Sequence, residues 1–514
     1  MRFFTAPMFA AACALTLAQP ALAQLRVVAW NISNYGGGRT AQIHDSVYAV
    51  FEGRSMAPDA FLLQEFTSQS AVDQFVAALN SAPGSPGDWA AAPFVNGPDT
   101  DSAFAYRTSK VQLLATVVVA EGGVAPNHPR HIMRYDVRPV GYDSPDATIA
   151  CYSTHMKSGT ASTDLQRRLL EAQRIRADAA ALPEGWSFMV GGDFNIQTSS
   201  QAAYQELIGA HSAGMGRFFD PISTPGSWNN NGAFRFVHTQ DPVGAGGMDD
   251  RHDQILLSSS LIEPRGLAYI GTISQTTGLP VAYSTTTWND PNHSYRSWGN
   301  DGTTFDQALA VAGNTMVGPV IAQALKDICA GAGHLPVFLD LRVPAEIDAT
   351  EAIDFGVVEQ FASASAILHV ANAGDVALWT GGGVSDLHYS IESPAGFSAP
   401  EGPFVEPPGG GANAHTVTMD TSKPGHIAGA MLVYSDAPDE PVRVVMLSGF
   451  VKAPVSCPGD ANGDGEVNFA DINIVLSNYN GSGQGLPGDL DGDGDVDFAD
   501  LNLVLANYGA FCGV

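Results

Sequence analysis

The sequence predicts a multidomain chain in which a large α/β domain precedes an all-β sandwich and a small helical domain. Three observations predict it. Residues 25–345 alternate short β-prone runs with helical stretches. Residues 350–452 lose the helical periodicity and contain short strands between Gly- and Pro-rich turns. Near the end of the chain, GDANGDGEVNFADINIVLSNY recurs as GDLDGDGDVDFADLNLVLANY, which is an internal repeat.

The chain begins with a pattern typical of export. Arg2 is followed by an apolar run and by ALA before Gln24, so residues 1–23 are predicted to be a secretory signal peptide cut after Ala23. No later stretch is long and apolar enough to predict a transmembrane segment. We therefore expect the mature protein to be secreted, either extracellular or associated with the cell surface.

The α/β domain is expected to span residues 24–345. Strands are predicted at 25–31, 60–65, 111–120, 148–155, 188–195 and 254–258, and helices at 71–82 and 162–182. In the second helix, one apolar face is expected to hold Leu165, Leu169, Ala172, Ile175 and Ala179. Its arginines lie mostly on other faces, which predicts a solvated basic surface.

Residues 346–452 are expected to form a β-sandwich of roughly immunoglobulin size. The predicted strands are at 366–374, 415–420, 429–436 and 442–449, each bounded by turn residues. The order of the motifs IDFGVVE, ILHVANAGD and GAMLVYSDAPDEPVRVVMLSGFV resembles the Hydin-like (ASH-type) Ig-like modules. That resemblance implies an Ig-like module at this place in the chain.

The charge and the cysteines of the chain bear on its substrate class and on its disulfides. The formal net charge is −29, and most of the excess acid lies outside the α/β domain, since residues 453–514 contain no Lys or Arg. No broad basic face is evident, which leaves a polyanionic substrate open without indicating one. A local exception is the basic cluster Arg130, Arg134, Arg138, Lys157, Arg167, Arg168, Arg174 and Arg176. Cys457 and Cys512 bracket one compact segment and are predicted to form a disulfide. Cys151 and Cys329 lie in apolar, strand-like contexts and are predicted to be buried free thiols.

The internal repeat has the spacing of a calcium-binding loop. Oxygen-bearing side chains occupy loop positions 1, 3, 5, 9 and 12, and glycine occupies position 6, where the chain must turn sharply. Position 7 would offer a backbone carbonyl. The repeats therefore predict two Ca²⁺ ions, although an acidic disordered tail is the alternative. The predicted ligands are Asp460, Asn462, Asp464, Glu466, Asn468 and Asp471 in the first loop and Asp489, Asp491, Asp493, Asp495, Asp497 and Asp500 in the second.

Two features of the repeats resemble a type I dockerin module. Position 12 is Asp rather than the Glu of an EF-hand, and no helix is evident before the first loop. The resemblance covers 457–514 and implies that the domain at 453–514 binds a cohesin-like or other cell-surface partner. Phe469–Ala470 and Phe498–Ala499 occupy the positions that often carry recognition residues in dockerins, which leaves the partner open.

In the α/β domain, polar residues stand at the ends of apolar strands. Four predicted strands finish in such residues, and two begin with them. If the last two strands run antiparallel to the first four, all of these residues meet at one rim of the sheets, where sites are commonly built. The residues are Asn31, Glu65, His155, Asp193 and Asn195 at strand ends, and Asp253 and His334 at strand starts.

These residue types suit hydrolysis of a phosphate ester. Glu65 is a hard ligand for Mg²⁺ (or Mn²⁺), and Asn31 can orient its coordination shell. Asp193 can orient or deprotonate an attacking water, while Asn195 can donate hydrogen bonds to phosphoryl oxygens. His155 and His334 can transfer protons and contact developing charge. Asp253 can hold His334 in one tautomer and stabilise its charged form.

The motifs AWNISNY, PDAFLLQE, STHMKSG, GGDFN and DDRHDQILLS resemble, in order, those of the endonuclease/exonuclease/phosphatase (deoxyribonuclease I-like) superfamily. The resemblance implies two mixed sheets packed together with helices outside. It also implies that Asn31 and Glu65 lie at the Mg²⁺ site and that His155, Asp193, Asn195, Asp253 and His334 are catalytic. The chain departs from the last motif, Ser-Asp-His, by having Ala332–Gly333–His334, which removes a carboxylate that often helps to bind metal.

We expect a secreted Mg²⁺-dependent phosphodiesterase, with extracellular nucleic acid as the first candidate substrate. A phospholipid or sugar-phosphate hydrolase is an alternative within the same enzyme class, although no aromatic membrane-contact loop is evident. A catalytically impaired surface-binding protein is the non-enzymatic alternative, in which Gly333 marks a decayed site. If the missing carboxylate is a handicap, Gly333→Asp is expected to raise activity or metal affinity.

Overall fold

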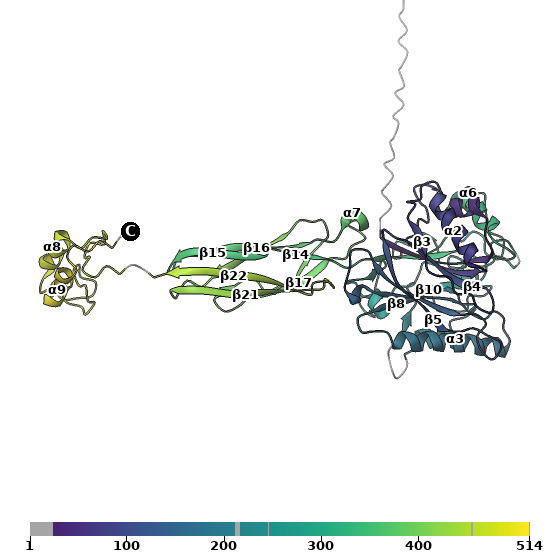
Figure 1. Ribbon diagram of the computed structural model, residues 1–514, viewed down its shortest axis with the longest axis horizontal. Helices are drawn as coiled ribbons and strands as arrows, with labels where there is room; N and C mark the ends of the chain where they lie inside the picture. The colour runs from purple at the N-terminus through teal and green to yellow at the C-terminus, as the bar shows by residue number, and fades with distance from the viewer. Residues whose placement is uncertain (1–23, 211–215, 245, 454–455, 513–514) are drawn as a thin grey trace, which may run out of the picture.

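A computed structural model describes residues 24–210, 216–244, 246–453 and 456–512. The signal peptide expected at 1–23 lies outside the described residues. An α/β body, a β-sandwich and a pair of helices follow one another along the chain, and the sandwich lies end to end with the α/β body (Figure 1). No helix of the described residues is long and apolar enough to cross a membrane.

The α/β body contains two β-sheets. The first is seven-stranded, with β12 (Arg296–Ser297) on β13 and the order β11 (Ala268–Tyr269), β13 (Val337–Arg342), β1 (Leu25–Tyr35), β2 (Ala60–Phe66), β4 (Asp101–Arg107) and β3 (Trp89–Ala91). The second is six-stranded, in the order β5 (Val111–Ala120), β6 (Ile132–Pro139), β7 (Ile149–His155), β8 (Ser187–Asp193), β10 (Asp253–Ser258) and β9 (Phe218–Phe219). The predicted α/β class and its six strands are confirmed.

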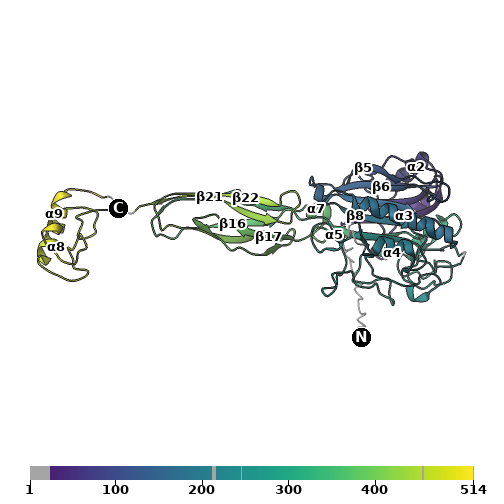
Figure 2. The same cartoon turned by 90° about the horizontal axis from the view of Figure 1, so that it is seen from below.

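Side chains from both sheets form the core between them. Ala29 and Leu62 of the first sheet pack with Cys151, Met189 and Ile255 of the second. Alternate residues of the same strands point outward and are covered by helices, because successive side chains of a strand face opposite sides. The first sheet is covered by α1 (Thr40–Tyr48), α2 (Gln69–Ser81) and α6 (Gly318–Asp327), and the second by α3 (Ser162–Ala180) and α4 (Ala202–Ile208), as Figure 2 shows for α3 and α4.

The predicted helix at 162–182 forms as α3, but its buried face is partly wrong. Leu165 is 40% exposed, whereas Arg168 and Arg176 are buried. Each guanidinium reaches backbone carbonyls: Arg168 donates to Gly159 (2.8 Å) and Arg176 to Gly209 (2.7 Å). A guanidinium offers five donors, so it is accepted in the interior where loop carbonyls need partners. The basic surface expected for this helix is therefore smaller than its sequence suggests.

Residues beyond the α/β body form a β-sandwich. A four-stranded sheet has the order β14 (Ile347–Ala349), β16 (Ser365–Asn372), β20 (Asn413–Met419) and β18 (Phe397–Ser398). It packs on a five-stranded sheet of β15 (Ala352–Glu359), β22 (Val442–Lys452), β21 (Gly425–Ser435), β17 (Leu387–Glu392) and β19 (Phe404–Glu406). The four predicted strands are present, while the likeness to Hydin-like modules stays a prediction.

The last described segment contains α8 (Phe469–Asn478) and α9 (Phe498–Ala506), one after each acidic loop. The predicted disulfide between Cys457 and Cys512 is confirmed. Cys151 is a buried free thiol in β7, as predicted. Cys329 is also free, but the expected strand context is wrong, because Cys329 follows the end of α6 and is only half-buried.

The sandwich is joined to the α/β body by specific contacts. Val343 pairs with the segment Gly383–Ser385, through hydrogen bonds of 2.8 and 2.9 Å. Trp379 of α7 (Val376–Trp379) is 1% exposed and belongs to the core between the two sheets of the body. The Lys110 ammonium lies 4.1 Å from the Trp379 ring centroid and donates to the Leu378 carbonyl. The junction is thus a packed interface, not a bare linker.

We expect Trp379→Ala to destabilise the chain by about 3–5 kcal/mol, because it removes a fully buried indole and leaves a cavity. Urea unfolding, followed by the circular dichroism of the backbone, measures the change. Phe361→Ala is the matched control, since Phe361 is an aromatic residue of the sandwich that is 75% exposed. A loss in Trp379→Ala no larger than that in Phe361→Ala would show that the junction does not depend on the indole.

Candidate active site

The rim predicted from the strand ends exists in the structure. β1 and β2 pair in parallel, as do β7 and β8, so these four strands end at the same edge of the body. β13 and β10 run antiparallel to their neighbours β1 and β8 and therefore begin at that edge. This is the strand arrangement that the sequence required. It brings together Asn31, Glu65, His155, Asp193, Asn195, Asp253 and His334.

The register of the second sheet sets three of these side chains side by side. His155 of β7 and Asp253 of β10 both pair with Asp193 of β8. Directly opposed residues on neighbouring strands have Cβ atoms about 4.5–5.5 Å apart. The distances between their functional groups follow from this register and not from flexible loops.

Two glycines of the GGDFN motif let the sheets and strands approach each other below the site. A Cβ on Gly191 would lie 2.9 Å from Leu62 Cδ1 and 3.1 Å from Ala29 Cβ, both on the facing sheet. A Cβ on Gly192 would lie 1.9 Å from the Thr154 carbonyl oxygen. Larger residues at either position would push the strands of the site apart.

Asp193 lies at the centre of the site. Its Oδ2 accepts a hydrogen bond from Asn31 Nδ2 (3.1 Å) and lies 3.2 Å from His155 Nε2 and 3.6 Å from His334 Nε2. Its Oδ1 accepts from the Asn195 backbone amide at 3.0 Å. Asp193 is 2% exposed, so its charge is held almost entirely by these neighbours.

Glu65 faces the same centre from the other sheet. Its Oε1 accepts from Asn31 Nδ2 at 2.9 Å, and its Oε2 accepts from the Asn34 backbone amide at 2.7 Å. Glu65 has φ of 65°, in the left-handed region that residues with side chains rarely adopt. Such backbone strain concentrates at functional sites. Asn195 also has a left-handed backbone conformation, with φ of 51°. Its side-chain amide donates to the Met156 carbonyl at 3.1 Å.

His334 is tied to Asp253 as the sequence predicts. His334 Nδ1 lies 2.8 Å from Asp253 Oδ2, which also accepts from the Thr239 hydroxyl at 2.7 Å. Asp253 is fully buried. The carboxylate therefore fixes the orientation of the imidazole, and Nε2 of His334 is left to face Asp193.

The two histidines are driven to opposite charge states. Burial lowers the pKa of His155 to about 4, because it outweighs the attraction of Asp193 and Glu65. Burial acts on His334 in the same direction, but the carboxylates of Asp253 and Asp193 outweigh it and raise its pKa to about 10. Although burial opposes it, the charge of His334 holds the pKa of Asp193 well below its usual range. At neutral pH, His155 is neutral and His334 is charged.

The donor set suits a divalent metal ion. Glu65 and Asp193 provide hard carboxylate oxygens on the two sides of Asn31, the kind of ligand that Mg²⁺ prefers. His155 Nδ1, which lies 3.7 Å from Glu65 Oε1, is buried and has no hydrogen-bond partner. An orphaned buried nitrogen beside two carboxylates indicates that a further group completes this side of the site.

Gly333 is not a position from which a carboxylate has simply been deleted. It has φ of +76°, and a Cβ there would lie 2.1 Å from Cys329 Sγ and 2.4 Å from Cys329 Cβ. The expectation that Gly333→Asp raises activity is therefore corrected: the new side chain would collide with Cys329. Position 333 has been repacked around glycine.

Other polar residues of the α/β body do not join the rim. His238 is fully buried, with its ring nitrogens 3.3 Å from the Met248 carbonyl and 3.1 Å from that of Trp228. His293 and Arg296 line a cavity of about 960 Å³ at the opposite end of the strands, where β13 ends at Arg342. Of the basic cluster, Arg130 lies near enough to His155 to lower its pKa.

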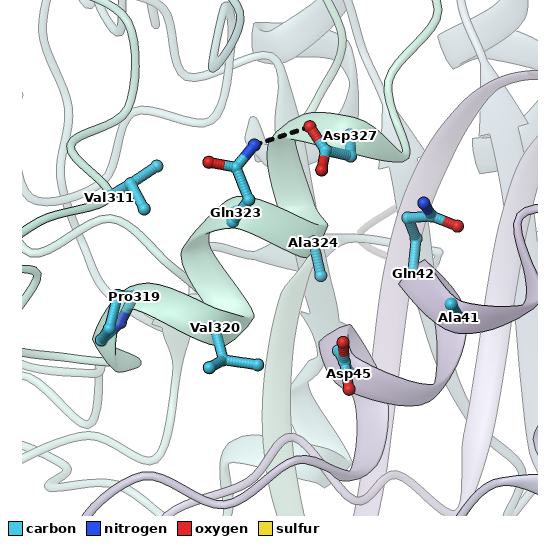
Figure 3. A pocket seen from close by; sticks show the side chains of 9 residues that line it. All are labelled: Ala41, Gln42, Asp45, Val311, Pro319, Val320, Gln323, Ala324 and Asp327. Carbon is cyan, nitrogen blue, oxygen red and sulfur yellow. Dashed lines mark hydrogen bonds between the residues drawn. The ribbon is translucent and has the colours of Figure 1, made fainter.

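The surface hollow between α1 and α6 does not coincide with the rim. A hollow of about 440 Å³ lies between α1 and α6, lined by Gln42, Asp45, Val320, Gln323 and Asp327 among others (Figure 3). None of the predicted site residues lines it. Asp327 accepts a hydrogen bond from Gln323 at 2.6 Å within α6, so Asp327 does not replace the carboxylate missing at 333.

Sequence reasoning missed Thr239, which bonds Asp253, and His252, whose charge lowers the pKa of Asp193. His252 belongs to the motif DDRHDQILLS, which was identified for Asp253. His252 stands directly before Asp253, and that adjacency to a predicted site residue was a usable signal. No sequence pattern pointed to Thr239, because its contact with Asp253 depends on a loop that crosses to β10.

Comparison with known proteins agrees with this geometry. The sequence profile of the Endonuclease/Exonuclease/phosphatase family matches residues 28–310, which is more than half of the chain. The chain is a member of the endonuclease/exonuclease/phosphatase family. Members of this family are typically metal-dependent phosphoester hydrolases. No curated protein matches the sequence.

Several solved structures resemble this family member. The human Nocturnin catalytic domain is 15% identical, and the match covers 62% of this chain and 93% of that chain with a TM-score of 0.34. Beta toxin of Staphylococcus aureus is 13% identical, with 62% and 99% covered and a TM-score of 0.35. An endonuclease/exonuclease/phosphatase from Beutenbergia cavernae is 12% identical, with 82% and 97% covered and a TM-score of 0.29. Because these TM-scores are low, the family assignment rests on the sequence match.

The two histidines should give folding stability opposite dependences on pH. The pKa of His334 rises on folding from 6.5 to about 10, so its stabilising effect is complete below pH 6.5 and is lost as pH rises through about 10. The pKa of His155 falls on folding to about 4, so stability is lost as pH drops from 6.5 towards 4.

Urea unfolding of the wild type and of His334→Gln tests the first of these effects. At pH 6 the variant should be less stable by about 1–3 kcal/mol, because a charged hydrogen bond to buried Asp253 is lost. The difference should shrink as pH rises through about 10. A difference that stays constant from pH 6 to 10.5 would contradict the raised pKa of His334.

Proposed function

We propose that the chain is a secreted, Mg²⁺-dependent phosphodiesterase and that its substrate is extracellular nucleic acid. The observation that carries the proposal is the contact of Asp193 with both imidazoles and with Asn31, at distances of 3.1–3.6 Å. A buried carboxylate between a neutral and a charged histidine suits attack of water on a phosphate ester and departure of the leaving oxygen.

The charge states divide the work between the side chains. Neutral His155 can accept a proton, whereas charged His334 can stabilise the negative charge that develops on a phosphoryl oxygen. Pairs of groups whose pKa values are pushed apart are typical of acid–base sites. The very low pKa of Asp193 makes it a poor base, so we assign it to orienting the water rather than deprotonating it. Asn195 is proposed to contact the phosphoryl oxygens.

Glu65 and Asn31 are proposed to hold the metal ion. When bound there, the ion would supply Lewis-acid polarisation of the phosphoryl oxygen. The chain's own residues orient it: Asn31 donates to both Glu65 and Asp193, and the Asn34 amide fixes the second oxygen of Glu65.

Two features favour nucleic acid over a membrane lipid. Among the described residues of the α/β body, no exposed aromatic side chain is available to enter a bilayer; the large exposed apolar residues there are aliphatic, such as Val124 and Val320. Arg130 acts on His155 and pairs at its other side with the half-exposed Asp99 at 3.2 Å, and it is proposed to bring a positive charge towards a backbone phosphate. Phospholipid or sugar-phosphate hydrolysis is the alternative that a substrate panel would reveal.

Asp193→Asn should lower phosphodiester hydrolysis by at least about a hundredfold, because a group acting on the water commonly contributes 10²–10⁴-fold. Release of acid-soluble nucleotide from DNA and RNA measures it, with Mg²⁺ and with EDTA. Asp327→Asn is the control, because Asp327 is an exposed carboxylate that accepts from Gln323 within α6. Hydrolysis that persists in Asp193→Asn but is absent in EDTA would contradict the role of Asp193.

The tail is proposed to bind two Ca²⁺ ions and to attach the enzyme to a cohesin-like or cell-surface partner. Its two loops have the same internal hydrogen bonds. Asp471 accepts from the Ala461 amide at 2.8 Å and the Asn468 amide at 2.9 Å, and Asp500 accepts from those of Leu490 (2.7 Å) and Asp497 (2.8 Å). In the second loop, Asp489, Asp491 and Asp493 have carboxylate oxygens within 4.8 Å of one another. Such crowding of like charges favours a cation.

Asp491→Asn should weaken Ca²⁺ binding to the second loop by about tenfold or more, because a charged ligand at position 3 is lost. Calorimetry with the full chain measures it. Glu401→Gln is the control, since Glu401 is an exposed carboxylate of the sandwich, outside both loops. Helix content of the tail should also fall in EGTA. Equal effects of the two substitutions would contradict the loop assignment.

A further inference from the structure

The candidate for a further role is Asp241, which the sequence did not single out. Asp241 is only half-buried, yet its Oδ1 is enclosed and has no hydrogen-bond partner. Buried carboxylate oxygens are nearly always paired, so an orphan indicates an absent ion, water or substrate.

The backbone places Asp241 near Gly333. Residues 239–243 run antiparallel to residues 332–335: Gln240 bridges His334, the Leu335 amide donates to Thr239 (2.8 Å), and the Val243 amide donates to Ala332 (3.4 Å). Asp241 follows Gln240 and Gly333 precedes His334, so the bridge brings these two residues into the same neighbourhood, while the Asp241 backbone amide donates to Gly247 at 3.1 Å.

The same segment is fixed to the active site. Its Thr239 hydroxyl donates to Asp253 Oδ2 at 2.7 Å and accepts from the Asp253 backbone amide at 3.1 Å. Asp253 in turn holds His334. Asp241 is therefore two residues from a group that contacts the catalytic pair, on a segment that cannot drift away from it.

The charges around Asp241 are those of the rim. Burial raises the pKa of Asp241, while His334 and then His252 lower it, so both imidazoles act on this carboxylate. Among the residues that the structure describes, Asp241 nevertheless forms no ion pair with either of them. His252 is 7% exposed, and neither of its ring nitrogens has a hydrogen-bond partner. His252 Nε2 lies 3.6 Å from Asp250 Oδ1, so the carboxylate oxygen left without a partner in this segment is that of Asp241.

We propose that Asp241 supplies, from the opposite strand, the carboxylate that this rim presents to its divalent cation, directly or through a cation-bound water. Position 333 cannot present one, because Cys329 occupies the space of its side chain. Asp241 is then a positioning residue for the cation held by Glu65, and the inference rests on the proposed metal site. Residues that support a metal site from outside its direct ligands commonly change metal affinity about 10–100-fold.

Calorimetric titration of Mn²⁺ into the full chain, with Ca²⁺ saturating the tail, tests the proposal. Binding that disappears in Glu65→Gln belongs to the rim. Asp241→Asn should weaken that binding about tenfold or more. Asp306→Asn is the matched control, because Asp306 is an exposed carboxylate of a nearby loop that does not act on His334. Circular dichroism verifies that each variant is folded.

A combined variant tests the geometry. Asp241→Asn with Cys329→Gly and Gly333→Asp clears the colliding Cys329 side chain and puts a carboxylate on the other strand. Recovery of Mn²⁺ affinity relative to Asp241→Asn alone supports the cross-strand placement, whereas no recovery contradicts it.

Two further outcomes separate this inference from the proposed function. If Asp241→Asn weakens Mn²⁺ binding no more than Asp306→Asn does, the role of Asp241 is overturned while the metal site stands. If the wild type shows no Mn²⁺ binding that depends on Glu65, the proposed metal site itself fails, and the inference fails with it.

Discussion

The site depends on how closely the two sheets of the α/β body approach each other. Asn31 and Glu65 come from one sheet, and His155, Asp193 and Asp253 come from the other. Their groups lie within hydrogen-bond distance only because Gly191 has no side chain to separate Leu62 and Ala29 from β8. Interior packing is dense and yields little, so the spacing of the sheets sets the spacing of the candidate catalytic groups.

That spacing also determines the charges. Both histidines are almost equally buried, at 7% exposed each, and burial disfavours the charged form of both. They differ because His334 has a carboxylate of its own, Asp253 at 2.8 Å, whereas His155 lies 3.2 Å from a carboxylate that it shares with Asn31 and His334. The division of charge is a consequence of which strand each carboxylate terminates.

Much of the fold and of the candidate site could be predicted from the sequence. Strands have period two and fixed directions, so polar residues at the ends of apolar runs can be assigned to one rim, as Glu65 and Asp193 were. The features that could not be predicted depend on contacts between distant loops. The burial of Arg168 requires carbonyls from residues 157–159, and the collision that forbids a side chain at Gly333 requires the return of the chain from α6.

Strand β13 connects the rim of the α/β body to the junction with the sandwich. His334 stands just before it at the rim, and Val343 just after it pairs with residues of the sandwich. Six residues at about 3.3 Å each separate the site from the junction by roughly 20 Å. The sandwich therefore attaches at the end of the body opposite the rim. A partner bound beyond the sandwich would hold the chain while leaving the rim open to a large polymeric substrate, which fits the proposed hydrolysis of extracellular nucleic acid.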